Sequence, residues 1–141
     1  LALDVRGTGE IGSLPDGTWG GGWNDFFISY LLGQSLVGLR AEDILISARA
    51  LSPDGKVELE AIGTLGVPAL HAAALEPRLF SAVVVRRGID SWSGLVRNPI
   101  APGQLVNVVH GALKVYDLPD LRRGLPAGML TVHDAIDVAA R

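Results

Sequence analysis

Segments with the two-residue period of a strand alternate along this chain with segments that have the 3.6-residue period of a helix. Eighteen glycines and eight prolines separate them. This alternation is typical of βα units, in which each strand is followed by a helix that crosses over to a parallel neighbour. The pattern therefore predicts an α/β fold with a mostly parallel sheet. At 141 residues, the chain has room for a single domain with a real core, spanning residues 1–141.

Three segments have the composition expected of strands. Residues 1–5 form a short apolar run, and residues 56–62 alternate apolar side chains with glutamates. Residues 80–86 contain three consecutive valines, as in a strand that is covered on both faces. Because a helix begins near Pro68, between the last two strands, we expect these strands to pair in parallel.

Helical spacing of apolar residues is clearest over residues 36–51 and recurs between residues 105 and 113. The aromatic segment at 25–32 predicts a short helix or lid, and a short amphipathic helix is expected after Asp117. Residues 13–23 are expected to form a loop, and residues 124–141 have too little periodicity to predict a strand.

Composition excludes several classes of function. The net charge is −3 and the basic residues are scattered, so the basic stripe of a nucleic-acid-binding protein is missing. The apolar runs fall short of the roughly 18 residues of a membrane span, so no membrane partner is expected. The absence of cysteine excludes a disulfide and a thiolate site, and the three histidines lack metal-ligand spacing. We expect neither a metal nor a cofactor.

The chain begins inside an apolar run and without Met, which leads us to expect an N-terminally truncated domain, with the compartment left open. A cut sheet would have an exposed edge strand, through which we expect self-association.

Residues 7–12, Gly-Thr-Gly-Glu-Ile-Gly, match the GxGxxG pattern of dinucleotide-binding loops. That interpretation needs a helix to begin inside the motif. Pro15, Gly17 and the glycines at 20–22 occupy the positions of that helix. We therefore expect a plain turn.

Together with the later segments of the chain, the same residues resemble the middle of the α/β-hydrolase fold, and more narrowly acetyl-xylan-esterase-type hydrolases. Residues 4–9 fit the D-x-R-G-x-G segment of that family, residues 66–78 resemble its nucleophile-elbow helix, and residues 106–121 resemble a later segment. The resemblance covers most of the chain. It implies the C-terminal part of a three-layer fold and a carboxylic-ester hydrolase acting on acetylated carbohydrate or a similar small ester.

The nucleophile position of this family is altered here. A GxSxG elbow places a serine on a strained strand-to-helix turn, where its hydroxyl faces the substrate. Alignment on the Ala-rich helix puts Gly63 at the position of that serine, with Thr64 next to it. Glycine has no side chain, so the ordinary acyl-enzyme route is closed at this position. On a tight turn, we expect Thr64 to point elsewhere.

Asp117 or Asp120 followed by His133 has the acid-then-histidine order of the other triad members. Helix capping explains the acids better, because Asp117 and Asp120 have the spacing of a capping box. His133 is expected at the surface. Ser91 follows the valine-rich strand, at the carboxyl end where open α/β sheets keep their ligand crevice, which makes it a candidate substitute nucleophile.

The remaining histidines and the tryptophans have ordinary structural explanations. His71 and His110 lie alone on helical stripes, where packing or solvation is the usual role. Trp19, Trp23 and Trp92 fit either the lining of a sugar or acyl pocket or plugs at the ends of the sheet.

Two functions stay open at this level. One is an ester hydrolase of acetyl-xylan-esterase type. The other is a non-catalytic module that keeps the fold and its crevice for binding or domain packing after losing the serine.

Overall fold

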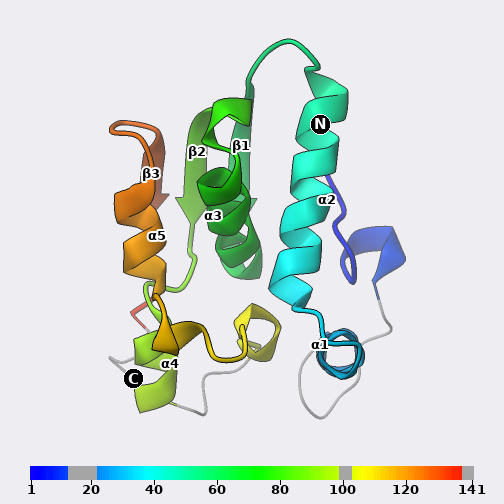
Figure 1. Ribbon diagram of the computed structural model, residues 1–141, viewed down its shortest axis with the longest axis vertical. Helices are drawn as coiled ribbons and strands as arrows, with labels where there is room; N and C mark the ends of the chain where they lie inside the picture. The colour runs from blue at the N-terminus through cyan, green and yellow to red at the C-terminus, as the bar shows by residue number, and fades with distance from the viewer. Residues whose placement is uncertain (13–21, 99–102, 138–141) are drawn as a thin grey trace.

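A three-stranded parallel sheet with the strand order β1-β2-β3 is the centre of the computed structural model (Figure 1). The strands are β1 (Val57–Ile62), β2 (Phe80–Arg86) and β3 (Leu130–His133). The structure describes residues 1–12, 22–98 and 103–137. Helices and parallel strands together confirm the predicted α/β class, and the pairing of β1 with β2 is parallel as expected.

In the described chain, two helices precede the first strand, one helix joins β1 to β2, and two helices lie between β2 and β3. Figure 1 shows α3 and α5 on the viewer's side of the sheet, with α2 beside α3. Short 3-10 turns connect several of them. The helix bounds are Trp23–Leu31 for α1, Leu36–Leu51 for α2, Gly66–Leu75 for α3, Trp92–Arg97 for α4 and Leu118–Gly124 for α5.

The core forms where α2 and α3 pack against the sheet and each other. Helix α2 has the predicted bounds, and its first turn is capped by the Ser35 hydroxyl, which accepts a hydrogen bond from the Gly38 N–H at 3.1 Å. Helix α3 is buried along most of its length, because its alanines let it approach the strands closely. On β1, Leu59 and Ala61 pack into this core, whereas Glu58 and Glu60, which alternate with them, face solvent.

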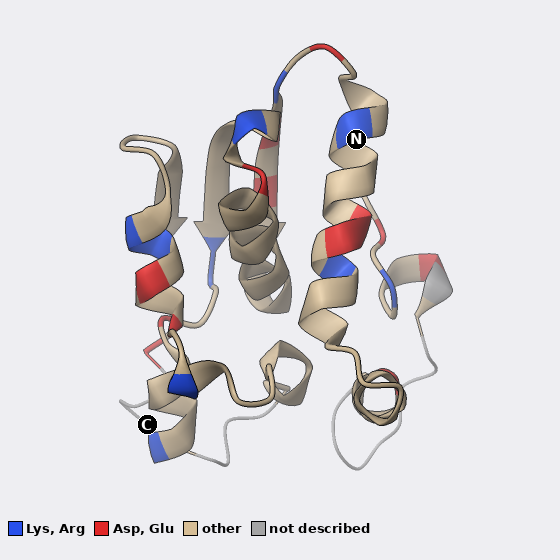
Figure 2. Ribbon diagram, viewed as in Figure 1, with Lys and Arg blue, Asp and Glu red and all other residues tan. Residues whose placement is uncertain are grey.

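Charged residues are interspersed over the surface of the described chain (Figure 2). A parallel strand that is covered on both faces is almost continuously apolar, and the two glutamates of β1 would not fit such a strand. Glu58 and Glu60 are exposed, and Glu60 forms an ion pair with Arg86 of the neighbouring strand. The alternation in β1 therefore matches a strand with one buried face.

Two expectations about local structure are wrong. Residues 1–5 are extended but pair with no strand in the described chain, although Val5 is buried at 2% exposure. A strand depends on hydrogen bonds to a neighbour, and here the next backbone N–H, that of Arg6, bonds to a side chain of α2 instead. In place of the helical stripe expected at 105–113, the structure has the 3-10 turns Leu105–Asn107 and Ala112–Lys114, because the backbone becomes extended at Val108 and Gly111 is left-handed with a φ of 74°.

Strand β3 was not predicted from the sequence. It has only four residues, Leu130–His133, and pairs with β2 in parallel register. So short a segment carries little periodicity, and its strand character comes from pairing with a partner far away in the sequence. The predicted self-association through a sheet edge stays a prediction. The expected loop at 13–23 lies largely outside the described residues, and Trp23 begins α1.

Two glycines lie where the first turn of α3 approaches the end of β2. Gly66 is the first residue of the helix, and Gly88 follows the strand. A Cβ atom on Gly66 would lie 2.7 Å from Cγ1 of Val85, and one on Gly88 would lie 2.8 Å from the same methyl group. Val85 is 1% exposed, and its β-branched side chain has little rotamer freedom. The Val85 methyl group thus fixes how closely α3 can lie to β2.

We expect Gly66→Ala to lower the free energy of unfolding by about 1–3 kcal/mol, because the added methyl group overpacks against Val85. Helix propensity alone would favour the alanine by up to about 1 kcal/mol. Urea denaturation measures the change, with Gly124→Ala as control, since no heavy atom lies within 4 Å of the Cβ position there. In the Val85→Ala background the penalty should shrink, and an equal penalty in both backgrounds contradicts the contact.

Candidate functional site

The carboxyl edge of the sheet has an unusual backbone. The strand ends are in register, because Ile62 pairs with Arg86 and Arg86 with His133. The residue after each of these ends is left-handed, with φ of 63° at Gly63, 53° at Arg87 and 50° at Asp134. Side chains seldom tolerate this conformation, and such strain is concentrated at functional sites. This edge, where ligands bind in open α/β sheets, is the candidate site.

Gly63 occupies the turn between β1 and α3, as the alignment predicts. The 3-10 turn Gly63–Leu65 leads directly into α3, so the order is strand, tight turn and helix. No heavy atom lies within 4 Å of the position of a Cβ on Gly63, so the space beside it is open. The φ of Gly63 is positive, the residue is half-buried, and glycine supplies no reactive group. Thr64 is half-buried in the same turn.

Ser91 is used as a helix cap. Its side chain is buried, with 7% of the residue exposed, and its Oγ accepts a hydrogen bond from the N–H of Gly94 at 3.1 Å. That contact makes Ser91 the N-cap of α4. No hydrogen bond in the described part of the chain joins Ser91 to a histidine, which a nucleophile would need.

Asp117 connects the first turns of two helices. Its Oδ1 accepts hydrogen bonds from the N–H groups of Trp92 and Leu118, both at 2.7 Å, and its Oδ2 accepts one from the N–H of Ser93 at 3.2 Å. Burial acts to raise the pKa of Asp117, but these hydrogen bonds to the carboxylate outweigh it, and the pKa is lowered. The carboxylate therefore stabilises the N-termini of both α4 and α5.

The predicted capping box is confirmed. Asp120 accepts a hydrogen bond from the backbone N–H of Asp117 at 2.7 Å and also pairs with Arg123. Both acids are thus engaged at the start of α5. His133, the last residue of β3, is exposed as expected, although the strand that carries it was not predicted. In the described chain, no hydrogen bond links His133 to either acid.

Replacing Asp117 with alanine should lower the free energy of unfolding by roughly 2 kcal/mol, because three backbone N–H groups lose their acceptor. Asp120→Ala should cost less than half as much, since it removes a single exposed capping contact. Chemical denaturation of both variants measures the difference. Equal stability of wild type and Asp117→Ala is the result that rules out the capping role.

His71 and Tyr116 form a polar contact that sequence reasoning missed. The Nδ1 of His71 lies 2.7 Å from the carbonyl oxygen of Val67, so this nitrogen carries the proton. Its Nε2 then accepts a hydrogen bond from the Tyr116 hydroxyl at 2.9 Å. The Trp92 ring lies 5.6 Å from the His71 ring and 5.4 Å from that of Tyr116. The packing role expected of His71 is confirmed, and nothing in the spacing of the sequence signals the tyrosine.

Burial lowers the pKa of His71, against the smaller opposing effect of its bond to Val67. The folded state therefore prefers the neutral ring. This contribution to stability should be complete above the ordinary histidine pKa of about 6.5 and should decline as the pH falls below that value. The decline is limited to about 1.4 kcal/mol per pH unit, the effect of one proton.

Urea unfolding, measured at several pH values between about 5 and 8, tests this expectation. His71→Gln should flatten the pH dependence, whereas His110→Gln, at an exposed position, should retain it. A wild-type slope that survives in His71→Gln assigns the effect to another group.

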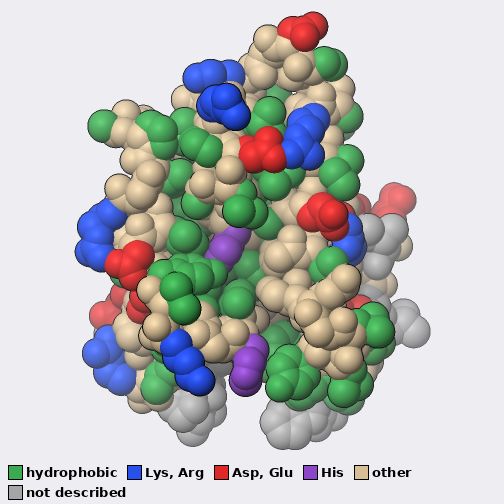
Figure 3. Space-filling model, in the orientation of Figure 1, with side chains coloured by type: hydrophobic (Ala, Val, Ile, Leu, Met, Phe, Trp, Pro, Cys, Tyr) green, Lys and Arg blue, Asp and Glu red, His purple; other side chains and the backbone are tan. Residues whose placement is uncertain are grey.

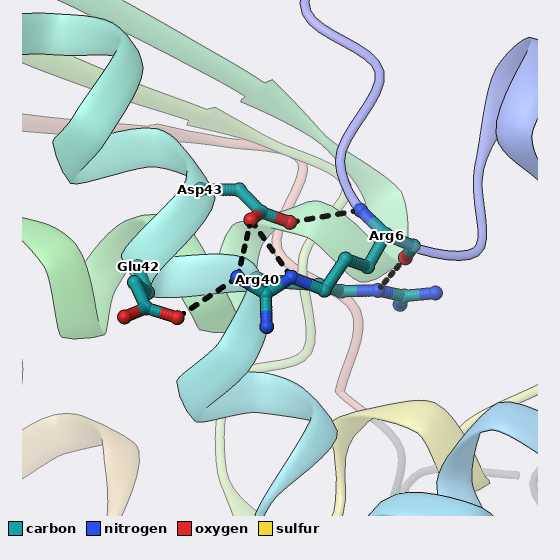
Figure 4. A network of polar contacts seen from close by, with 4 residues as sticks. All are labelled: Arg6, Arg40, Glu42 and Asp43. Carbon is teal, nitrogen blue, oxygen red and sulfur yellow. Dashed lines mark hydrogen bonds and ion pairs between the residues drawn. The ribbon is translucent and has the colours of Figure 1, made fainter.

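The D-x-R-G-x-G segment anchors the start of the chain to α2 (Figure 4). The Arg6 backbone N–H and Nε donate to the two carboxylate oxygens of Asp43 at 2.9 and 2.8 Å, and Nη2 of Arg6 reaches Glu42. Arg40, 3% exposed, donates from Nε to the Arg6 carbonyl oxygen at 2.9 Å. Arg6 of the motif is engaged in this network, whereas Asp4 accepts a hydrogen bond from the backbone N–H of Glu10 at 3.2 Å.

The glycines of that segment are favoured by the backbone, since φ is 71° at Gly7 and 54° at Gly9. A Cβ on Gly7 would lie 2.5 Å from a carboxylate oxygen of Asp25, and one on Gly9 would lie 2.0 Å from the carboxyl group of Asp4. Gly9–Ile11 forms a single 3-10 turn, which confirms the expected turn. The positions at which a dinucleotide-binding helix would continue lie outside the described residues.

The two tryptophans that the structure describes, Trp23 and Trp92, have different surroundings. Trp23 packs edge-to-face against Phe27 with ring centroids 5.8 Å apart, and Trp92 is buried with its Nε1 donating to the Asn107 carbonyl oxygen at 2.8 Å. Trp92 also lines an apolar groove beside α4. Trp19 lies outside the described residues.

Within the ranges that the structure describes, no group of three or more His, Asp or Glu side chains is placed to hold a metal ion. The helices of the same ranges include none with the length and apolar character needed to cross a membrane. Comparison of the chain with protein-family models, curated proteins and solved structures finds no match.

Proposed function

We propose that this chain is part of an α/β-hydrolase-type, three-layer domain of the acetyl-xylan-esterase kind that has kept the elbow and lost its nucleophile. The observation that carries the proposal is Gly63, which has a φ of 63° on the turn between a parallel strand and its crossover helix. The open space beside it is where an elbow serine would present its hydroxyl. Acetylated carbohydrate or a similar small ester is the ligand class that the family resemblance implies.

The function supported best is a non-catalytic one, in which the carboxyl edge binds a ligand or packs against another domain. A serine hydrolase needs a hydroxyl within hydrogen-bond reach of a base, and the base must be held by an acid. Gly63 offers no hydroxyl, Ser91 caps α4, and Asp117 is bonded to backbone N–H groups. Ser91 and Asp117, two of the side chains considered for a triad, are therefore engaged in holding the fold.

Ester hydrolysis is the second candidate, and one observation favours it. His133 is exposed at the same edge as Gly63, through the register of Ile62, Arg86 and His133. An imidazole at that edge could act as a general base toward a bound ester. A nucleophile would then have to come from a water molecule or another side chain.

Hydrolysis rates of nitrophenyl acetate separate the two candidates. We expect the wild type, Ser91→Ala and His133→Ala to show the same low, non-saturating rate, because no nucleophile–base pair is assembled among the residues that the structure describes. Circular dichroism confirms that each variant is folded. A saturable wild-type activity that either substitution abolishes would establish the chain as a hydrolase and identify its nucleophile or base.

A further inference from the structure

An apolar groove of about 340 Å³ lies between α4 and the turn Ala112–Lys114, η5. Figure 1 shows these segments below the arrowheads of the strands, on the side of the carboxyl edge. The volume falls within the roughly 300–1,000 Å³ typical of small-molecule pockets. The lining residues are Trp92, Leu95, Val96, Val108, Val109, Gly111, Ala112, Leu113 and Lys114.

The groove combines a buried floor with an exposed apolar rim. Trp92 and Ala112 are 4% and 6% exposed, whereas Val96 and Leu113 on the rim are 68% and 46% exposed. The hydrogen bond from the Trp92 indole to the Asn107 carbonyl holds the floor in place. Figure 3 shows hydrophobic side chains exposed at this lower end of the molecule. Filling the groove with a chain of methylene groups would remove apolar surface from water.

Among the described residues that line the groove, Lys114 is the only charged one. Its side chain is exposed and takes part in none of the ion pairs found among the described residues. No acidic side chain is among the described residues that line the groove. An apolar channel with a cation at its mouth complements a ligand that has an apolar tail and an anionic head.

We propose that this groove binds a small aliphatic carboxylate, with the hydrocarbon chain over Trp92 and the carboxylate at the Lys114 ammonium group. This ligand class differs from the acetylated carbohydrate of the proposed function, which would need polar groups along the walls. The inference is independent of that function, because it rests on neither Gly63 nor a catalytic side chain. The hydrocarbon chain supplies most of the affinity, and Lys114 selects the charge of the head group, since exposed ion pairs contribute little.

Titration calorimetry with octanoate, octanol, octylammonium and acetate tests the chemistry of the ligand. We expect octanoate to bind up to roughly fivefold more tightly than octanol, which is the most that one exposed ion pair contributes. Octylammonium should bind more weakly than octanol, and acetate should not bind. Acetate binding as tightly as octanoate, or no octanoate binding to the wild type, would overturn the proposal.

Substitutions locate the site. Val96→Trp places a ring in the groove and should weaken octanoate binding by about tenfold or more. Val115→Trp is its matched control, because Val115 is 84% exposed and does not line the groove. Lys114→Ala should bring octanoate down to the affinity of octanol and leave octanol unchanged, with Lys56→Ala as the control. Unchanged octanoate binding in Val96→Trp contradicts the location.

Sedimentation velocity decides between a small ligand and a second copy of the chain as the occupant. We expect Val96→Trp to leave the sedimentation coefficient unchanged. A wild-type dimer that both octanoate and Val96→Trp dissociate would assign the groove to a subunit interface and overturn the proposal.

Discussion

The contact of Val85 with Gly66 and Gly88 determines the arrangement of the sheet and of the elbow beside it. The Val85 methyl group fills the space that side chains at both glycines would need. Helix α3 can therefore begin directly over β2, and the turn from β1 into α3 is short. A turn of this kind requires a left-handed residue, which is Gly63.

A second constraint fixes the start of the chain. Residues 1–5 have no neighbouring strand in the described chain, yet Val5 is buried in the core that α2 also lines. The bonds from Arg6 to Asp43, and from Arg40 back to the Arg6 carbonyl, hold this segment against α2. Arg40 is almost completely buried, and burial lowers its pKa while Asp25 and Asp43 act to raise it. A motif that looks functional in the sequence is explained by the contacts it makes.

Elements held together by local interactions could be predicted from the sequence. The bounds of α2 follow from its apolar period and the Ser35 cap, and the capping box of α5 follows from the spacing of Asp117 and Asp120. Elements that depend on distant partners could not. Strand β3 exists because β2 pairs with it, and residues 1–5 form no strand because no strand of the described chain lies beside them. The same distinction holds for the candidate site. The place of Gly63 in a turn was predicted from the sequence, whereas its alignment with Arg87 and Asp134 depends on the register of the strands.

The shortness of α4 and α5 accounts for the hydrogen bonds that hold Ser91 and Asp117. Helices α4 and α5 have six and seven residues, too few for a helix to be stable by itself in water. Their first turns therefore depend on side-chain acceptors, which Ser91 and Asp117 provide. A hydroxyl or carboxylate held by these backbone N–H groups keeps its position only while it keeps those bonds. Catalysis by either group would weaken the helices that position it, so the exposed groups of the carboxyl edge and the groove beside Lys114 are where binding is to be sought.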